Sequence, residues 1–240
     1  MPKADIWGVS TYYEMKGIGE PIVFIHPFRH DHKVWDSQVD FFVKEGYRTI
    51  TYDLRGHGKT DGSTCPKYNM DVFARDLYIL IEKLRTGMPH IVGTSLGGMI
   101  AESYAAKYPL HLKSLAVVSS VYPERTRMLS IFLFLKTARI YREEWMKHAR
   151  EGRYSADKDE MLKIKGAISS FEQDLGNVSV PVLVVSGENE YKVMQGQSDT
   201  LERMLGAQRA IIPNSGHHPN RENPEVFNEI LLRFLRGELA

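Results

Sequence analysis

Residues 91–97 read Ile-Val-Gly-Thr-Ser-Leu-Gly, and this stretch decides how the rest of the chain is interpreted. Two apolar, β-branched residues precede the pentapeptide Gly-x-Ser-x-Gly, and a helix-favouring segment follows it. Between a strand and a helix, this pattern is typical of a sharp turn that exposes the serine hydroxyl. It predicts that Ser95 is a nucleophile and that the chain is a hydrolase. Such a pentapeptide would occur by chance in roughly one chain in ten of this composition, so its weight depends on its surroundings.

The composition fits a soluble enzyme with a substantial core. Hydrophobic residues make up 42% of the 240 residues and charged residues 25%, and the net charge of +1 is spread along the chain. This balance gives no reason to expect nucleic acid or a membrane as a partner. The single cysteine, Cys65, excludes an internal disulfide and a cysteine-rich metal site. No apolar signal segment is visible, and the longest apolar stretch, residues 128–135, is too short to span a bilayer, so we expect a cytoplasmic protein.

Apolar runs alternate with amphipathic stretches along most of the sequence, which is typical of a parallel sheet covered by helices on both faces. We expect an opening hairpin formed by residues 7–13 and 21–26, with its turn at residues 17–19. The remaining pattern predicts strands at residues 47–52, 90–93, 112–118, 180–185 and 209–212, and helices at residues 34–45, 70–85, 96–107 and 224–235. The fold class is therefore α/β with a mostly parallel central sheet.

The alternation breaks between residues 121 and 177. This stretch is dense in charge, lacks the signal of a buried strand and contains an apolar group that includes Met128 and Phe132. Ligands of open α/β sheets bind beyond the carboxyl ends of the strands. We therefore interpret residues 121–177 as a small helical lid over that edge, with Met128 and Phe132 contacting the substrate. Residues 1–120 and 178–240 form the core.

Two loops downstream of Ser95 carry the other groups that a nucleophilic serine requires. Residues 186–190 read Ser-Gly-Glu-Asn-Glu and follow one predicted strand, and residues 214–218 read Asn-Ser-Gly-His-His and follow the next. Both loops should open at the edge of the sheet where Ser95 lies. We expect His217 to accept the Ser95 proton, while a carboxylate fixes the tautomer of His217 and stabilises its charged form.

Further motifs occur in the order found in a known family. Residues 52–58 read Tyr-Asp-Leu-Arg-Gly-His-Gly, residues 180–187 Val-Pro-Val-Leu-Val-Val-Ser-Gly, and residues 212–217 Ile-Pro-Asn-Ser-Gly-His. With residues 93–97, these motifs resemble the α/β-hydrolase superfamily across nearly the whole chain. The resemblance implies an α/β-hydrolase fold, with helices flanking the sheet and a small helical lid. It also implies a catalytic triad of Ser95, His217 and an acid, with no metal and no cofactor.

The acid departs from the usual family pattern. Three residues after the glycine, where the family usually has aspartate, this chain has Glu190, whose side chain is one methylene longer. Its loop must retreat by about one bond length to keep the hydrogen bond to His217. Glu188 is close in sequence but would point differently. Glu124 follows the preceding strand, where some members place the acid. Glu190 is the expected triad acid, and both rivals stay open.

Two backbone N–H groups are expected to form the oxyanion hole. In the family they belong to the residue after the nucleophile, here Leu96, and to the loop after the first buried strand. Pro27 has no N–H, so Phe28 is the nearest donor in that loop. Proline stands where the family usually has glycine and cannot take a positive φ. Either the loop adopts a conformation that proline allows, or the hole is less well formed.

Several polar residues near these motifs are given other roles. By analogy with the resembled loop, Asp53 and Arg55 hold their turn by a salt bridge and hydrogen bonds. His30 and His32 have the spacing of a metal pair, but no third ligand is near in sequence, so we expect them in a solvent-exposed loop. His218 is expected to line the pocket and to make it more polar.

A serine nucleophile excludes the family members that use aspartate, such as haloalkane dehalogenases and epoxide hydrolases. A small lid with apolar residues favours a small or medium acyl group over a long lipid, so we expect a carboxylesterase acting on a small-molecule ester. One alternative is an enol-lactonase or C–C bond hydrolase of the same fold. Another, of a different class, is a small-molecule receptor or signalling protein with slow turnover. The sequence does not specify the oligomeric state.

Overall fold

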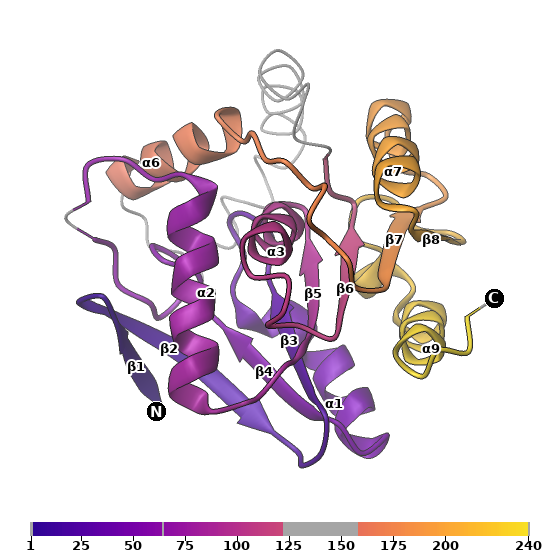
Figure 1. The fold of residues 1–240 in the computed structure, drawn as a ribbon, viewed down its shortest axis with the longest axis horizontal. Coiled ribbons are helices and arrows are strands. Elements are labelled where there is room, and N and C mark those ends of the chain that lie inside the picture. Colours follow the sequence, from indigo (N-terminus) through magenta and orange to yellow (C-terminus); the bar gives the residue numbers. More distant parts are fainter. Residues whose placement is uncertain (1, 64, 122–157, 240) are drawn as a thin grey trace.

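The strands form a sheet in the order β1-β2-β4-β3-β5-β6-β7-β8 (Figure 1). The computed structural model describes residues 2–63, 65–121 and 158–239. Within these ranges β1 pairs antiparallel with β2, β2 pairs antiparallel with β4, and the later pairs are parallel. The strands are β1 (Lys3–Ile6), β2 (Val9–Lys16), β3 (Pro21–Ile25), β4 (Arg48–Tyr52), β5 (His90–Thr94), β6 (Ser114–Val118), β7 (Val182–Gly187) and β8 (Gln208–Ile212).

Helices connect the strands. They are the 3₁₀ helix η1 (His32–Trp35) and the α-helices α1 (Asp36–Lys44), α2 (Met70–Leu84), α3 (Leu96–Lys107), α6 (Lys158–Ser169), α7 (Lys192–Leu205), α8 (Pro219–Glu222) and α9 (Pro224–Leu235). In the described part of the chain, none of them combines the length and the apolar character needed to cross a bilayer.

Two buried hydrophobic clusters cover the two faces of the sheet. One contains side chains of α2, α3 and α6 with Leu201 of α7, and the other contains side chains of α1 and α9. The strands β3, β5, β6 and β7 are buried along their whole length. Their continuous apolar runs follow from this, because helices cover both sides of each strand. The predicted α/β-hydrolase fold, with a mostly parallel sheet flanked by helices, is confirmed.

The opening hairpin differs from the prediction. Strand β2 pairs with β1 and β4, whereas β3 pairs with β4 and β5, so residues 7–13 and 21–26 are not partners. The hairpin turn lies instead at Trp7 and Gly8, both of which have positive φ. Two such residues form the tight turn whose twist suits antiparallel strands. The short strand β1, with one buried residue, gave too weak a pattern to be recognised.

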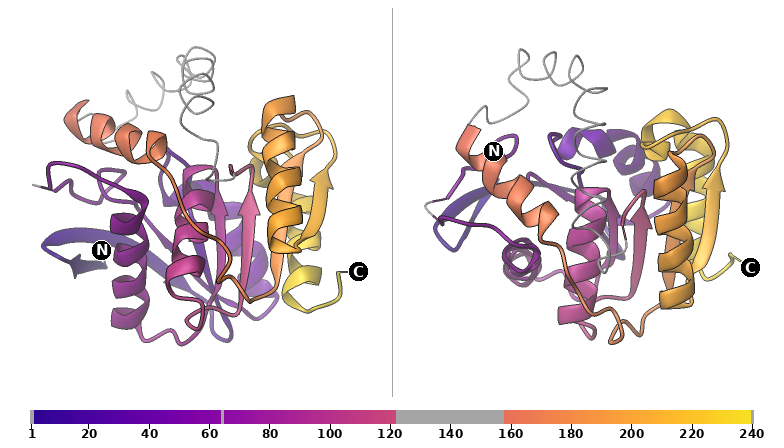
Figure 2. Two further views of the ribbon diagram at one scale, coloured as in Figure 1. Left: turned by 45° about the horizontal axis from the view of Figure 1, so that its top comes forward. Right: turned by 90° about the horizontal axis from the view of Figure 1, so that it is seen from above.

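Helix α6 belongs to the segment predicted as a lid. Ile164 and Ala167 are fully buried and join the core cluster of α2 and α3. Figure 2 shows α6 beyond the edge toward which the arrows of β5 and β6 point. The division into a core and a lid stays a prediction, because residues 122–157 lie outside the described ranges.

Helix α3 contains a buried carboxyl group. The side chain of Glu102 is fully buried, and its Oε1 accepts a hydrogen bond of 2.6 Å from the Ser120 hydroxyl. Burial raises the pKa of Glu102 to about 8, and the bond from Ser120 offsets only part of this rise. Glu102 is therefore a neutral acid at pH 7 in the folded protein, whereas it is ionised in the unfolded chain.

We predict that Glu102→Gln removes a pH-dependent loss of stability. The folded pKa lies above the ordinary value of 4.5, so the stabilising contribution of Glu102 is complete below pH 4.5 and is lost as the pH rises to about 8. The loss is at most about 1.4 kcal/mol per pH unit. Glutamine keeps the acceptor for Ser120 but does not ionise. In urea unfolding between pH 5 and 8, the free energy of unfolding of the variant should increase relative to that of the wild type as the pH rises.

The control for this experiment is Glu82→Gln, an exposed glutamate on α2. This variant should follow the wild-type profile. Parallel profiles for Glu102→Gln and the wild type would contradict the assignment of a neutral Glu102.

Candidate active site

Ser95 joins β5 to α3 in a conformation that serine rarely adopts. Its φ is +53° and its ψ is −114°, and a sparsely populated backbone region costs a residue of this type on the order of 1–3 kcal/mol. The Ser95 N–H donates to the Val118 carbonyl at 2.8 Å, and the Ser95 carbonyl accepts from the Met99 N–H at 3.0 Å. The residue is only partly buried, as a nucleophile requires. The structure therefore has the strand, turn and helix that the sequence predicts around Ser95.

The glycines of the pentapeptide are needed for space. A Cβ atom on Gly93 would overlap the carbonyl of Gly97, and one on Gly97 would overlap the carbonyl of Ile25 on β3. Neither glycine has a positive φ. Their role is therefore to let α3 pack closely on β3 and β5. Ser95 itself adopts the strained conformation of the turn.

The predicted base and acid form a hydrogen-bonded pair. His217 Nδ1 donates to Glu190 Oε2 at 2.9 Å, and Glu190 Oε1 accepts from the Tyr191 N–H at 3.0 Å. The Glu190 carboxylate is fully buried, whereas the His217 side chain is 13% exposed. Burial alone would raise the pKa of Glu190, but the bond and the charge of His217, with smaller contributions from Ser119 and Tyr191, hold the pKa below its ordinary value. Glu190 is therefore a buried carboxylate, and His217 keeps Nε2 for another partner.

Glu188 has a different partner. Its Oε2 accepts a hydrogen bond of 2.9 Å from the Asn214 N–H, and its own N–H donates to the Ile212 carbonyl at 2.9 Å. These bonds tie the loop after β7 to the loop after β8. Glu188 therefore holds the two loops together, while Glu190 faces His217. The other rival, Glu124, lies outside the described residues.

The loops after β3 and β8 meet, although three strands separate β3 from β8 in the sheet. The rings of His30 and His218 lie 5.2 Å apart, and those of His217 and His218 lie 5.0 Å apart. His218 is buried, and burial, followed by the charges of His217, His30 and Arg221, holds its pKa well below the ordinary value. His218 is thus a neutral ring beside His217, where the sequence predicts a polar pocket residue.

Two buried histidines hold the loop that carries Phe28. The Nε2 atom of His26 accepts from the Leu54 N–H at 2.9 Å, and the Nε2 atom of His57 accepts from the Arg29 N–H at 3.2 Å. Each ring donates through Nδ1 to a backbone carbonyl, at 2.8 Å and 3.1 Å respectively. Burial lowers the pKa of His26 to about 3 and that of His57 to about 4. Both rings therefore stay neutral and act as fixed acceptors.

This loop avoids the conflict expected at Pro27. The positive φ of the loop, +64°, falls on Arg29, two residues later. Pro27 lies outside the left-handed region, so the loop adopts a conformation that proline allows. The role of Phe28 as an oxyanion donor stays a prediction. The sequence did not indicate His57 as an anchor of Arg29, because the two residues are 28 positions apart and belong to different motifs.

The second expected oxyanion donor, Leu96, is the first residue of α3. The N–H groups in the first turn of a helix have no carbonyl partner within the helix, and they carry a partial positive charge. The residue is buried, with 1% of its surface exposed. Its N–H is therefore suited to an anion that approaches Ser95.

Asp53 and Arg55 are held within the fold. Asp53 is fully buried and accepts from the Lys59 N–H, the His32 N–H and His32 Nδ1, the last at 2.6 Å. Arg55 makes two bonds to Asp76, at 2.7 and 2.8 Å. The prediction that His32 lies in a solvent-exposed loop is wrong. His32 is only 3% exposed, because its ring bonds to the buried carboxylate of Asp53. Burial, the largest single effect, opposes the charged form of His32. The bond to Asp53 and the negative charges of Asp53, Asp31 and Glu14 together outweigh burial, and the net effect raises the pKa of His32.

The remaining predicted site residues cannot be placed. Met128 and Phe132 lie outside the described ranges. Across residues 2–63, 65–121 and 158–239, no group of three or more His, Cys, Asp or Glu side chains could hold a metal ion.

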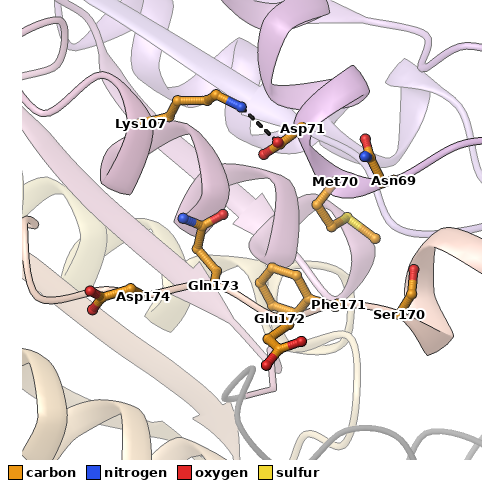
Figure 3. A pocket seen from close by; sticks show the side chains of 9 residues that line it. All are labelled: Asn69, Met70, Asp71, Lys107, Ser170, Phe171, Glu172, Gln173 and Asp174. Atoms are coloured by element: carbon orange, nitrogen blue, oxygen red, sulfur yellow. Dashed lines mark ion pairs between the residues drawn. The ribbon is translucent and has the colours of Figure 1, made fainter.

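A cavity of about 600 Å³ lies elsewhere in the molecule (Figure 3). It is formed by the start of α2, the end of α3 and the segment after α6. Lys107 and Asp71 face each other across part of it, with their charged groups 2.7 Å apart. Ser95, Glu190 and His217 do not line this cavity, so it is separate from the candidate active site.

Comparisons with known proteins agree with the fold and the motifs. A family model described as the α/β-hydrolase fold matches residues 20–157. This match covers more than half of the chain, which therefore belongs to the α/β-hydrolase family.

Relatives and a solved structure extend this result over nearly the whole length. The chain is 26% identical to a putative non-heme chloroperoxidase of Synechocystis sp., with 95% of each chain covered. It is also 26% identical to the bifunctional esterase/perhydrolase of Acinetobacter calcoaceticus, covering 96% of this chain and 97% of the relative. A solved structure from a study of carboxylesterases of Nitrososphaera gargenis superposes with a TM-score of 0.82 at 23% identity, covering 96% and 95% of the two chains.

We predict that His57→Phe lowers the rate of hydrolysis at least tenfold while the protein stays folded. The variant removes the acceptor of the Arg29 N–H, so the loop that carries Phe28 loses its anchor. Loss of an oxyanion donor costs about 10²–10³ in kcat, and a displaced donor should cost part of that. The matched control is His111→Phe, an exposed histidine next to Tyr108. Wild-type kcat in a folded His57→Phe would show that the anchor has no part in catalysis.

Proposed function

We propose that this protein is a carboxylesterase-type serine hydrolase that cleaves small-molecule esters of small to medium acyl groups. The observation that carries the proposal is the His217–Glu190 pair, which follows β7 and β8 and belongs to the same sheet edge as Ser95 on its strained turn. A buried carboxylate on one ring nitrogen makes the other nitrogen a base, which a serine nucleophile requires.

The mechanism follows from these roles. Ser95 Oγ attacks the ester carbonyl while His217 Nε2 takes its proton, and the bond from Nδ1 to Glu190 stabilises the imidazolium. The N–H groups of Leu96 and Phe28 bind the oxyanion of the tetrahedral intermediate. The intermediate then expels the alcohol, which receives the proton from His217. Water, activated by His217, attacks the acyl-serine by the same route and releases the carboxylic acid.

The names of the relatives support esters as the substrate class, but they also include peroxidase and perhydrolase activities. One relative is named as both an esterase and a perhydrolase, and another as a chloroperoxidase. A nucleophilic serine with a base and an oxyanion hole forms the same acyl-enzyme in ester and peracid chemistry. We place ester hydrolysis first because it needs only water as the second substrate.

We predict that Ser95→Ala abolishes both ester hydrolysis and labelling by a fluorophosphonate probe. The substitution removes the only group proposed to form the acyl-enzyme and leaves the fold intact. Ser170→Ala, a serine at the separate cavity, serves as the control and should behave as the wild type. Retained hydrolysis or labelling in Ser95→Ala would contradict the proposal.

The substrate class is tested with p-nitrophenyl esters of increasing chain length and with an enol-lactone. An esterase for small acyl groups should show its highest kcat/KM on the short chains. An enol-lactone hydrolysed faster than every ester would move the assignment to a lactonase. Tight binding with almost no turnover of any compound would indicate a receptor.

We predict that Glu190→Gln lowers kcat by about 10⁴, as the equivalent loss does in a serine protease. A glutamine cannot stabilise the imidazolium. The matched control is Glu188→Gln, which alters a carboxylate in the same loop that bonds to Asn214 and not to His217. Glu188→Gln should keep kcat within about threefold of the wild type. A larger loss in Glu188→Gln or in Glu124→Gln than in Glu190→Gln would reassign the acid.

A further inference from the structure

The carboxyl end of β6 lies between the proposed nucleophile and the proposed acid. Strand β6 pairs with β5, which leads to Ser95, and with β7, which leads to Glu190. Val118, the last residue of β6, accepts the Ser95 N–H at 2.8 Å, and Ser119 N–H donates to the Val185 carbonyl at 2.9 Å. The backbone of residues 118 and 119 is thus fixed to both neighbouring strands.

The following residue is fixed through its side chain. The hydroxyl of Ser120 donates to Glu102 on α3 at 2.6 Å, and both side chains are buried. Helix α3 also presses on this residue, because a Cβ on Gly98 would overlap Ser120. Ser119 therefore stands between two residues that are each held in place.

Ser119 has a conformation that glycine would adopt more easily. Its φ is +48°, in the left-handed region, and it is fully buried. A residue with a Cβ is strained in this conformation, whereas glycine is not. A serine at this position therefore destabilises the fold relative to glycine, and a function of its hydroxyl would account for its presence.

The hydroxyl of Ser119 acts on the Glu190 carboxylate. It contributes, together with His217 and the Tyr191 N–H, to holding that group in its ionised form. Ser119 Oγ is buried and has no hydrogen bond of ordinary length and angle in the described part of the chain, to Glu190 or to any other group. Its influence on the charge of Glu190 nevertheless indicates that this carboxylate lies near the hydroxyl.

We propose that Ser119 is a positioning residue for the catalytic acid: from the end of β6, its hydroxyl donates to Glu190 and holds this side chain against His217. The proposal rests on the proposed function, since it assigns Ser119 a role through Glu190. Glutamate has one more rotatable bond than aspartate, and fixing a flexible side chain costs entropy. A third donor, besides His217 and Tyr191, restricts the longer side chain to the orientation that the base requires.

The first test compares Ser119→Gly and Ser119→Ala with the wild type on a p-nitrophenyl ester. Both variants lose the hydroxyl, and the glycine variant also relieves the backbone strain. We expect kcat to fall about tenfold in both, with KM changed less than twofold, while Ser119→Gly unfolds at a temperature no lower than the wild type. Ser103→Ala, a buried serine on α3 that bonds to Gln173, is the control and should keep wild-type kcat. Wild-type kcat in Ser119→Gly and Ser119→Ala would overturn the proposal.

The second test is a double-mutant cycle with Glu190→Gln, because residues that act as a unit lose activity non-additively. If Ser119 acts through Glu190, adding Ser119→Ala to Glu190→Gln should change kcat less than twofold. An equal tenfold loss in both backgrounds would overturn the proposal and make Ser119 a structural residue. Wild-type kcat in Glu190→Gln alone would instead refute Glu190 as the acid of the proposed function. This outcome does not depend on what Ser119 does.

Discussion

The close packing of α3 against β3 and β5 is the constraint on which the candidate site depends. It is possible only because Gly93 and Gly97 carry no side chain where helix and strand meet. That contact forces the chain through a turn too tight for ordinary backbone angles, and Ser95 takes the strained conformation. The same approach brings the start of α3 beside the loop after β3. The positions of the proposed nucleophile and of both expected oxyanion donors thus follow from one packing contact.

Buried polar groups fix the loops around this contact. His26 and His57 remain neutral because burial opposes their charge, so each offers a fixed acceptor to a backbone N–H. Asp53 stays charged in the interior because several donors surround it. An unpaired group of either kind would cost on the order of 1–3 kcal/mol. The motif at residues 52–58 therefore supports the loop that contains Phe28. The polar residues of this motif have a structural role.

The sequence predicted the parts that are local in the chain. The strands and helices of the core have strong periodicity, and Ser95, Glu190 and His217 each follow a strand within a short motif. The structure places Glu190 against His217, but the roles of all three stay predictions. Pairings between distant segments were not predictable. The hairpin at Trp7 and Gly8 and the hydrogen bond of His32 to Asp53 both join residues whose pairing only the fold creates.

We propose that Ser95, His217 and Glu190, which follow the ends of β5, β8 and β7, carry out covalent acyl transfer through Ser95. The most direct test is the mass of the protein, quenched in acid during turnover of a p-nitrophenyl ester and then mapped by peptides. We expect a mass increase equal to one acyl group, located on the peptide that contains Ser95. Steady release of p-nitrophenolate with no adduct under any quench condition, or with the adduct on another residue, would contradict it.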